Sequence, residues 1–419
     1  MHPSNEVSPT RVGGSITLPR AHVIAVIVCW LFVVFDGYDL IVYGNVISSL
    51  QDEWGISAST AGTLGSLAFV GMMIGAVLAG RLSDAIGRKK AVIGCVVVLS
   101  IFTTLCAMAP GPIVFGLLRL IAGIGLGGLV PTSNALAAEL VPNKWRAAVA
   151  TMMMSGVPIG GSIAALIGIP VIPNWGWRPM FAFALIPLLI LVPLAMKVLP
   201  SHSVLDTHPD SSEGGFKALL GARFRTISIM FAAVTIVTLL AWYGLGTWLP
   251  KLMQGEGTDL GNALTFALAL NLGAVAGSFI TAWGGVRFGS VPTSIIAALI
   301  AGIALLTLLL DPPVAAVYLI FVLAGVGTHG TQALIIAAVA SYYPDHLRGT
   351  ALGWALGVGR IGAVAAPQIG GWLLAAGLGA DSNFVLFGIS ALISSLLLTV
   401  IWKKFPAQHE PLRGPILAH

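Results

Sequence analysis

Gly80-Arg-Leu-Ser-Asp84-Ala-Ile-Gly87-Arg88-Lys89-Lys90 is a short polar stretch between two long apolar segments, and it decides how the chain is interpreted. Gly80 allows two helices to cross closely, and Gly87 can turn the chain. The cations hold such a loop at a membrane surface, while Asp84 can pair with an arginine at a neighbouring helix end. The stretch therefore predicts a charged latch between membrane helices. An ordinary basic loop that only fixes topology is the simpler alternative.

The composition extends this interpretation to the whole chain. Of the 419 residues, 57% are hydrophobic and only 9% are charged, and the mean hydropathy is +0.95. These values are typical of a protein dissolved in lipid. With about 20 apolar residues per span, the length predicts an all-α polytopic membrane protein of about twelve transmembrane helices. Small residues, as in Gly71-Met-Met-Ile-Gly75, favour close helix packing.

The charge distribution predicts the topology. The formal net charge of +5 could indicate an acidic partner such as nucleic acid. However, all but four of the 21 Lys and Arg fall in the termini and in alternate loops if both termini are cytoplasmic. That pattern follows the positive-inside rule, so we predict cytoplasmic termini and no nucleic-acid partner. The polar N-terminus lacks a signal peptide, so the first helix should be retained.

An internal repeat divides the chain into two halves. Pro142-Asn-Lys-Trp-Arg146 recurs as Pro344-Asp-His-Leu-Arg348, an offset of 202 residues (142 to 344). Two similar six-helix halves are typical of a rocking transporter whose substrate site lies between them near the midplane. We predict the following parts: 1–21, a cytoplasmic N-terminal tail; 22–200, a six-helix bundle; 201–225, a cytoplasmic linker; 226–404, a second six-helix bundle; and 405–419, a cytoplasmic C-terminal tail.

Two acids lie in the middle of the first apolar segment. Asp36 and Asp39 are three residues apart and therefore share a helix face. An ionised carboxylate at the bilayer centre costs about 2.5 to 3.5 kcal/mol even on permissive scales. A pair of them indicates a protonatable site that lines a path through the membrane. We predict that one of the two carries the coupled proton.

Two arginines fall within apolar segments. Arg119 cannot be neutralised in the membrane, so it needs an anion, either Asp36 or Asp39 or a substrate carboxylate held bidentately. A purely structural ion pair is the alternative. Arg360 is a second intramembrane cation for which helix pairing and anion attraction both remain open. Asn134, further along the Arg119 stretch, has no assigned role.

Polar and aromatic residues in other segments complete the predicted substrate site. His329 is the only histidine deep in an apolar segment, and Gln332 is one turn further along. The histidine could bind a carboxylate or a phenol, or relay a proton, although a satisfied structural role is equally open. Aromatic side chains could stack on an aromatic ring, while interfacial or core packing is their simpler fate. The candidates are Tyr38, Trp242 and Tyr243.

A second charged cluster is predicted at the cytoplasmic end of the Arg119 stretch. Glu139 precedes Arg146 there, and a structural charge cluster is the expected role. We group these two with the loop residues as a conformational gate. The gate residues are Gly80, Asp84, Gly87, Arg88, Glu139 and Arg146. The three cysteines are scattered through apolar segments without a paired spacing, so no metal site is expected.

The motifs resemble those of a known family. The loop from Gly80 to Lys90 closely resembles the signature loop of the major facilitator superfamily, although its second-half counterpart, Gly284-Gly-Val-Arg287-Phe-Gly289, has no equivalent of Asp84. Asp36-Gly-Tyr-Asp39, the Arg119 stretch and Gly357-Val-Gly-Arg360-Ile-Gly362 are together similar to the aromatic acid:proton symporters of bacteria. The likeness covers nearly the whole chain.

This resemblance implies a proton-coupled secondary transporter of the bacterial inner membrane. It would import a benzoate-type or hydroxybenzoate-type anion by alternating access, with Asp36, Asp39 and Arg119 important for transport. The implied partners are an aromatic carboxylate, protons and the lipid bilayer. We expect a monomer with no cofactor besides the proton.

Other functions remain open from the sequence. A permease for another organic anion, such as an aliphatic dicarboxylate, or a proton-driven exporter would share most of these features. A membrane sensor would need a soluble output module, for which neither terminus is long enough. A membrane enzyme is disfavoured because the sequence contains no nucleophile-and-base constellation.

Overall fold

The computed structural model describes residues 19–200, 214–405 and 407, and helices are the only regular elements in those ranges. The first half holds most of its residues in five long helices and a broken sixth one. Their bounds are α1 Arg20–Trp54, α2 Ala58–Ile86, α3 Arg88–Cys106, α4 Pro112–Glu139, α5 Asn143–Trp175, α6 Arg178–Ala182, the π-helix η1 Pro187–Leu191, and α7 Val192–Val198.

The second half repeats this arrangement after a short helix. The bounds of the helices in the second half are α8 Gly214–Leu219, α9 Arg225–Gly255, α10 Leu260–Phe288, α11 Ser290–Leu306, the 3₁₀ helix η2 Thr307–Leu310, α12 Val314–Tyr342, α13 Asp345–Ala375 and α14 Gly379–Lys404. The predicted linker 201–225 is therefore partly helical. Its residues 201–213, like most of the two predicted tails, lie outside the described residues.

The described helices are long and apolar enough for a polytopic membrane protein. Eleven segments qualify as membrane spans by length and composition, and one of them joins α6, η1 and α7 into a single span, Arg178–Val198. The 31-residue α13 is not among the eleven, because its glycines and Arg360 lower its hydropathy. It nevertheless runs through the bundle beside α9 and α2. The prediction of an all-helical protein with about twelve spans is confirmed.

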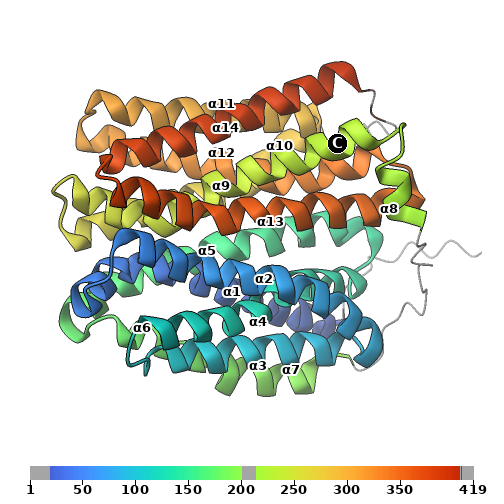
Figure 1. Cartoon of the computed structure of the whole chain (residues 1–419). Coiled ribbons are helices and arrows are strands. Elements are labelled where there is room, and N and C mark those ends of the chain that lie inside the picture. The colour runs from blue at the N-terminus through green and yellow to red at the C-terminus, as the bar shows by residue number, and fades with distance from the viewer. Residues whose placement is uncertain (1–18, 201–213, 406, 408–419) are drawn as a thin grey trace, which may run out of the picture.

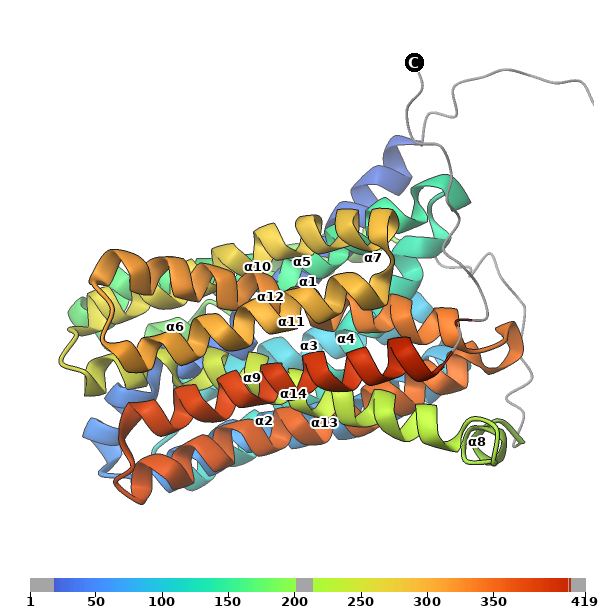
Figure 2. The ribbon, with the colours of Figure 1, turned by 90° about the horizontal axis from the view of Figure 1, so that it is seen from above.

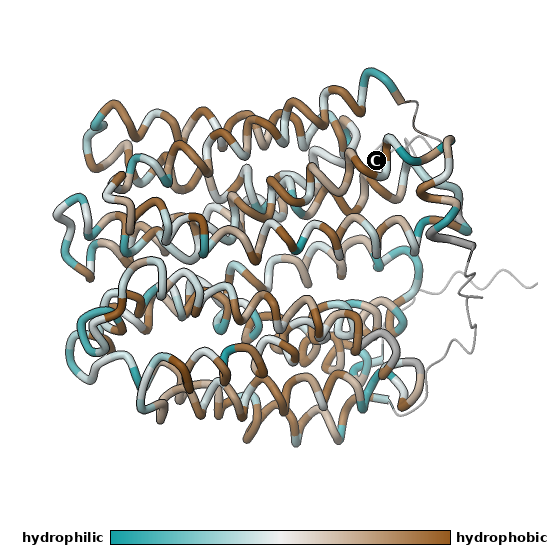
Figure 3. The backbone as a smooth tube through the Cα atoms, viewed as in Figure 1, coloured by the Kyte–Doolittle hydropathy of each residue, from teal (hydrophilic) through white to brown (hydrophobic). Residues whose placement is uncertain are grey.

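The helices form two bundles that lie side by side (Figure 1). In Figure 1, α1 to α7 make up the lower bundle and α9 to α14 the upper one. Contacts between the bundles run mainly through α2 with α13, α5 with α10, and α1 with α9. In Figure 2, the first turn of α1 and the last turn of α14 lie at the same end as α8. Hydrophilic residues gather at the two ends of the helices, as Figure 3 shows.

The repeat seen in the sequence recurs as repeated contacts. A Cβ added to Gly123 of α4 would lie 2.1 Å from the Ala68 oxygen of α2. At the corresponding place in the second half, a Cβ on Gly325 of α12 would lie 2.0 Å from the Leu270 oxygen of α10. Only glycine permits such close helix crossings. The two halves are therefore pseudo-symmetric in packing.

Corresponding residues also begin and end helices in the two halves. Gly87 between α2 and α3 has φ +86°, and Gly289 between α10 and α11 has φ +97°. Both lie in the left-handed region that favours glycine, as predicted for the turn at Gly87. Ser57 and Asp259 each cap the following helix through a side-chain oxygen. Hydrogen bonds from Asn262 lower the pKa of the Asp259 carboxyl.

The halves are packed together at the end opposite to α8. There, Thr63 of α2 donates a hydrogen bond to Gln368 of α13 across 2.8 Å, and Ser66 donates to the Val364 carbonyl across 2.6 Å. The same stripe of α13 continues toward α8 through Gly353 and Gly357. A Cβ on either glycine would meet nothing within 4 Å. The α2–α13 contact therefore opens toward the α8 end.

Candidate functional site

A buried ion pair lies at the centre of the first bundle. One oxygen of Asp39 on α1 is 2.7 Å from Nη1 of Arg119 on α4, and Nη2 lies 3.3 Å from the Asp39 backbone carbonyl. Both side chains are at most 3% exposed. The arginine thus has an internal acid as its anion, which is one of the two alternatives that its sequence left open. Such a pair persists only with further hydrogen bonds around it.

The second oxygen of Asp39 is held by α3. Thr103 donates a hydrogen bond to it across 2.6 Å, and the Thr103 side chain is itself buried. The Arg119 guanidinium lies 5.8 Å from the centre of the Tyr43 ring, which suits a cation–π contact. Asp39, Thr103, Tyr43 and Arg119 all belong to the first bundle. The ion pair is therefore enclosed within one half of the molecule.

Asp36, one turn before Asp39, has a different environment. It is fully buried, and neither of its carboxylate oxygens has a hydrogen-bond partner in the described ranges. An ionised carboxylate in that position would lose its hydration without compensation. The environment therefore favours the neutral acid in this conformation. Asp36 and Asp39 therefore share a helix face but differ in their hydrogen-bonding surroundings.

Arg360 lies where the two bundles meet. Its Nη1 donates a 2.6 Å hydrogen bond to the backbone carbonyl of Met72, so α13 of the second bundle reaches α2 of the first. It is close enough to Asp36 and Tyr243 to interact with both electrostatically. Its hydrogen-bond acceptor is a neutral carbonyl, so no direct ion pair among the described residues matches its positive charge. The guanidinium can attract an anion at this boundary.

Polar and aromatic side chains of the second bundle surround this boundary. His329 of α12 packs against Trp242 of α9, with ring centres 4.9 Å apart, and its Nε2 lies 3.2 Å from the Met154 carbonyl of α5. Tyr243 packs against Phe69 of α2, with ring centres 4.7 Å apart.

Gln332 completes this group. It lies beside the Tyr243 hydroxyl, although its Oε1 has no hydrogen-bond partner among the residues that the structure describes. Tyr243, His329 and Gln332 therefore form a polar layer with Asp36 and Arg360, which we call the interface layer.

Tyr38, a predicted substrate residue, and Asn134, which had no assigned role, lie elsewhere. Tyr38 donates a 2.7 Å hydrogen bond to the Met180 carbonyl in α6, so its hydroxyl is engaged inside the first bundle. Asn134 lies on α4, beyond the Arg119 ion pair, and its Oδ1 is buried without a partner in the described part of the chain. Nothing in the contacts brings either side chain to the interface layer.

The predicted gate residues form contacts at the α8 end of the first bundle. Arg88 pairs with Glu139 at the end of α4 across 2.7 Å. Arg146 donates a 3.2 Å hydrogen bond to the Ala138 carbonyl. Lys89, which was not among the predicted residues, donates to the carbonyls of Met196 and Leu199. The α2–α3 loop therefore ties together the ends of α4 and α7. The side chain of Asp84 lies outside the described part of the structure.

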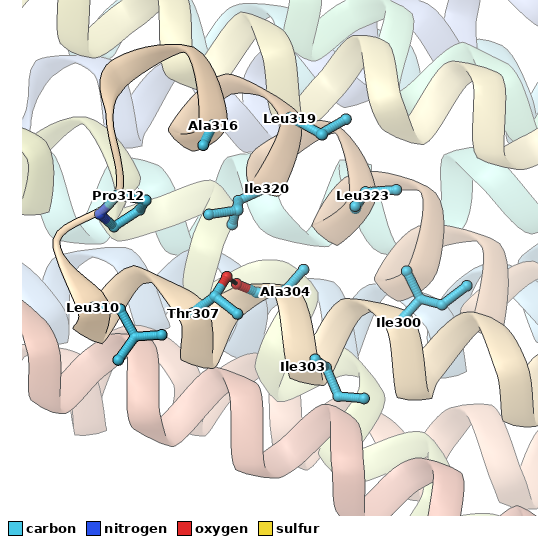
Figure 4. Close-up of a pocket in the computed structure, with 10 residues that line it drawn as sticks. All are labelled: Ile300, Ile303, Ala304, Thr307, Leu310, Pro312, Ala316, Leu319, Ile320 and Leu323. Atoms are coloured by element: carbon cyan, nitrogen blue, oxygen red, sulfur yellow. Dashed lines mark hydrogen bonds between the residues drawn. The ribbon is translucent and has the colours of Figure 1, made fainter.

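One crevice of the second bundle is lined by apolar side chains. It has a volume of about 480 Å³ and lies between α11, η2 and α12, lined by side chains such as Ile303, Leu310 and Ile320. Figure 4 shows these apolar side chains around it. Its one hydroxyl, on Thr307, already donates to the Ala304 carbonyl. Nothing in it would bind a carboxylate. Within the described ranges, no group of three or more His, Cys, Asp or Glu side chains could hold a metal ion.

Sequence reasoning missed the neutral partners of the charged groups. Thr103 carried no signal because a single threonine in an apolar segment is common. The Met72 and Met154 carbonyls are backbone groups, whose availability depends on which helix lies opposite. Pro158 is a signal that could have pointed to the Met154 carbonyl, since a proline inside a helix leaves the carbonyl four residues earlier without its helical donor.

Two pseudo-symmetric helical bundles with buried charges at their boundary define a polytopic membrane transporter rather than an enzyme. Residues 29–310 and 267–416 match the family model described as Major Facilitator Superfamily. The chain belongs to the major facilitator superfamily.

Named relatives narrow the comparison. The chain is 63% identical to a gentisate transporter of Corynebacterium glutamicum over 385 residues, which cover 90% of this chain and 87% of that protein. It is 32% identical to a benzoate transport protein of Acinetobacter baylyi, over 98% of this chain and 96% of that protein. A crystal structure of a D-xylose-proton symporter shares the fold, with a TM-score of 0.77 at 20% identity, and covers 92% of this chain and 99% of that one.

Proposed function

We propose that this protein imports an aromatic carboxylate of the gentisate or hydroxybenzoate class together with protons, by alternating access. Relatives that are named as gentisate and benzoate transporters support the substrate class. The observation that carries the coupling mechanism is the pair of carboxylates on α1, one bound to Arg119 and the other buried without a partner among the described residues. Acids buried in membrane spans are typical of proton relays.

Asp36 is the proposed proton carrier. When it is neutral, its burial between the bundles costs little, so the halves can pack around it. When it loses its proton, an uncompensated charge develops beside Arg360, which is close enough to respond electrostatically. Asp39 stays paired because Arg119 and Thr103 bind both of its oxygens.

Arg360 is the proposed anchor for the substrate carboxylate. Arg360 lies between the bundles and donates a hydrogen bond to a neutral carbonyl, whereas Arg119 is paired with Asp39 within the first bundle. A guanidinium can bind a carboxylate through two parallel hydrogen bonds. Arg119 becomes a direct ligand only in a state in which Asp39 is protonated. In the proposed cycle Arg119 otherwise holds the Asp39 side chain in place.

The cycle then has four steps. Asp36 takes a proton from outside, the substrate carboxylate binds Arg360, and the neutral, occupied site allows the halves to rock. Loss of the proton and the substrate to the cytoplasm returns Asp36 and Arg360 to their unloaded state. One proton with one monoanion is electroneutral, and each further proton would draw about 2.3 kcal/mol per 100 mV of membrane potential.

The orientation is part of the proposal. Both termini, α8 and the Arg88–Glu139 pair would face the cytoplasm, and the α2–α13 contact near Thr63 would close the outer side. The protein would act as a monomer in the bacterial inner membrane. Residues 22–200 and 226–404 would move as the two rigid bodies. In the Gly221→Cys variant, the new cysteine should react with a membrane-impermeant thiol reagent only from the cytoplasmic side.

Uptake into proteoliposomes tests the function. Radiolabelled gentisate, benzoate, 4-hydroxybenzoate and protocatechuate are offered with an inward proton gradient. Accumulation that an uncoupler abolishes is the expected result. Accumulation of aliphatic dicarboxylates alone, or substrate-driven proton movement only in the outward direction, would contradict the proposal in favour of another permease or an exporter.

A further inference from the structure

A proline in α5 leaves a backbone carbonyl free at the boundary between the two bundles. Pro158 lies inside α5 and has no N–H, so the carbonyl of Met154, four residues earlier, lacks its helical donor. His329 of α12 takes that place, with Nε2 3.2 Å from the Met154 oxygen. A hydrogen bond from one bundle to the other therefore replaces one within α5.

This contact fixes the histidine tautomer. A carbonyl oxygen can only accept, so the hydrogen is on Nε2 of His329. The side chain is 1% exposed, and no hydrogen-bond partner in the described ranges reaches Nδ1. A second proton there would bury a positive charge without compensation. Nδ1 is therefore a buried acceptor that faces no donor among the described residues.

A second acceptor lies one turn further along α12. His329 and Gln332 are three residues apart and share a helix face. The Gln332 Oε1 is also buried without a partner within the described residues. Two neighbouring acceptors repel a carboxylate and attract a hydrogen-bond donor. The Trp242 and Phe69 rings, packed on His329 and Tyr243, give the surroundings an aromatic character.

We propose that Nδ1 of His329, held as an acceptor by the carbonyl that Pro158 leaves free, accepts a hydrogen bond from a ring hydroxyl of the substrate. Pro158 is then a positioning residue that acts through His329. The substrate carboxylate lies toward Arg360, which interacts with Tyr243 next to Gln332. The inference rests on the proposed function and narrows its substrates to hydroxylated aromatic acids.

The test compares gentisate with benzoate, which keeps the carboxylate but has no hydroxyl. Pro158→Ala returns an N–H to α5, which bonds the Met154 carbonyl and releases His329. The ratio of kcat/KM for gentisate to that for benzoate should fall about tenfold, the effect of one buried hydrogen bond. Pro170→Ala is the matched control because Pro170 lies inside the same helix but is exposed. It should leave the ratio unchanged.

Two substitutions of His329 test the proposed hydrogen bond to Nδ1 independently, even if Pro158→Ala fails to fold. His329→Gln keeps an amide that can donate to the Met154 carbonyl but removes the acceptor at Nδ1, so the ratio should fall as in Pro158→Ala. His329→Asn places an oxygen near Nδ1 and should retain more of the ratio. A wild-type ratio in His329→Gln overturns the inference. Failure of the wild-type protein to take up either acid would instead overturn the proposed function.

Discussion

At the scale of single residues, the two acids of α1 differ in their surroundings more than in their chemistry. Asp39 has a guanidinium and a hydroxyl on its two oxygens, whereas both oxygens of Asp36 lack partners in the described part of the chain. Removing one member of a buried ion pair leaves the other uncompensated. Replacing a neutral buried acid by its amide leaves no charge uncompensated. Substitution should therefore change the stability of the protein little at Asp36 and strongly at Asp39.

Asp36→Asn should leave thermal stability in detergent close to that of the wild type and abolish accumulation driven by a proton gradient. The amide mimics the protonated acid, so the loaded carrier can still exchange substrate across the membrane without net proton movement. Counterflow in proteoliposomes measures that exchange. If the variant accumulates substrate with the wild-type pH dependence, Asp36 does not carry the coupled proton.

The Asp39–Arg119 pair should show strong coupling in a double-mutant cycle. Asp39→Asn and Arg119→Gln should each destabilise the protein by about 3–5 kcal/mol, and the double variant by much less than the sum. Thermal unfolding in detergent measures these costs. The exposed Glu53–Arg178 pair, with side chains 36% and 44% exposed, is the matched control. Its coupling should be at most about 1 kcal/mol. Additive costs at the buried pair would mean that the two charges are not interdependent.

At the scale of helices, glycines set how closely α2 and α4 approach. A Cβ on Gly75 would lie 2.0 Å from the Ile124 oxygen of α4, which is backbone and cannot move aside alone. A Cβ added to Gly94 of α3 would meet nothing within 4 Å. The same substitution should therefore have different effects at the two positions.

Gly75→Ala should destabilise the protein by about 1–3 kcal/mol, because overpacking forces the two helices apart. Gly94→Ala, the control, should be neutral or slightly stabilising, since alanine is the better helix former. Thermal unfolding of both variants in one detergent makes the comparison. Equal stabilities would show that α2 can shift away from α4 at no cost.

At the scale of the whole molecule, contacts between the bundles gather at the end opposite to α8. Thr63 and Gln368 join the bundles there, whereas α13 faces open space at Gly353 and Gly357 nearer α8. Rocking in alternating access requires the packed end to separate. Holding that end closed should therefore stop the cycle.

A short, cleavable thiol crosslink between Thr63→Cys and Gln368→Cys should abolish uptake, and reduction of the crosslink should restore it. The same crosslink between Glu53→Cys and Arg178→Cys is the control, because both residues belong to the first half of the chain and are paired there at 2.7 Å. It should leave uptake unchanged. Full uptake with the crosslink between the bundles in place would contradict rocking of rigid halves.

The sequence determined the fold because lipid leaves few alternatives. An apolar segment in a bilayer must satisfy its backbone hydrogen bonds internally, so composition and length alone give the helices. Its repeat and its glycines, such as Gly87 and Gly75, predicted turns and close crossings that depend only on backbone conformation. Its buried charges, Asp36, Asp39 and Arg119, could be singled out because charge in an apolar segment is costly wherever it lies.

Tertiary structure alone decided which partner each charge has. The sequence left Arg119 with two acids or a substrate, and packing of α1 against α4 gave it Asp39. It likewise left Arg360 open, and the contact of α13 with α2 placed that arginine between the bundles. Such contacts join residues far apart in the chain through neutral hydroxyls and carbonyls. Those groups acquire a role only when another helix lies opposite, so no local pattern marks them.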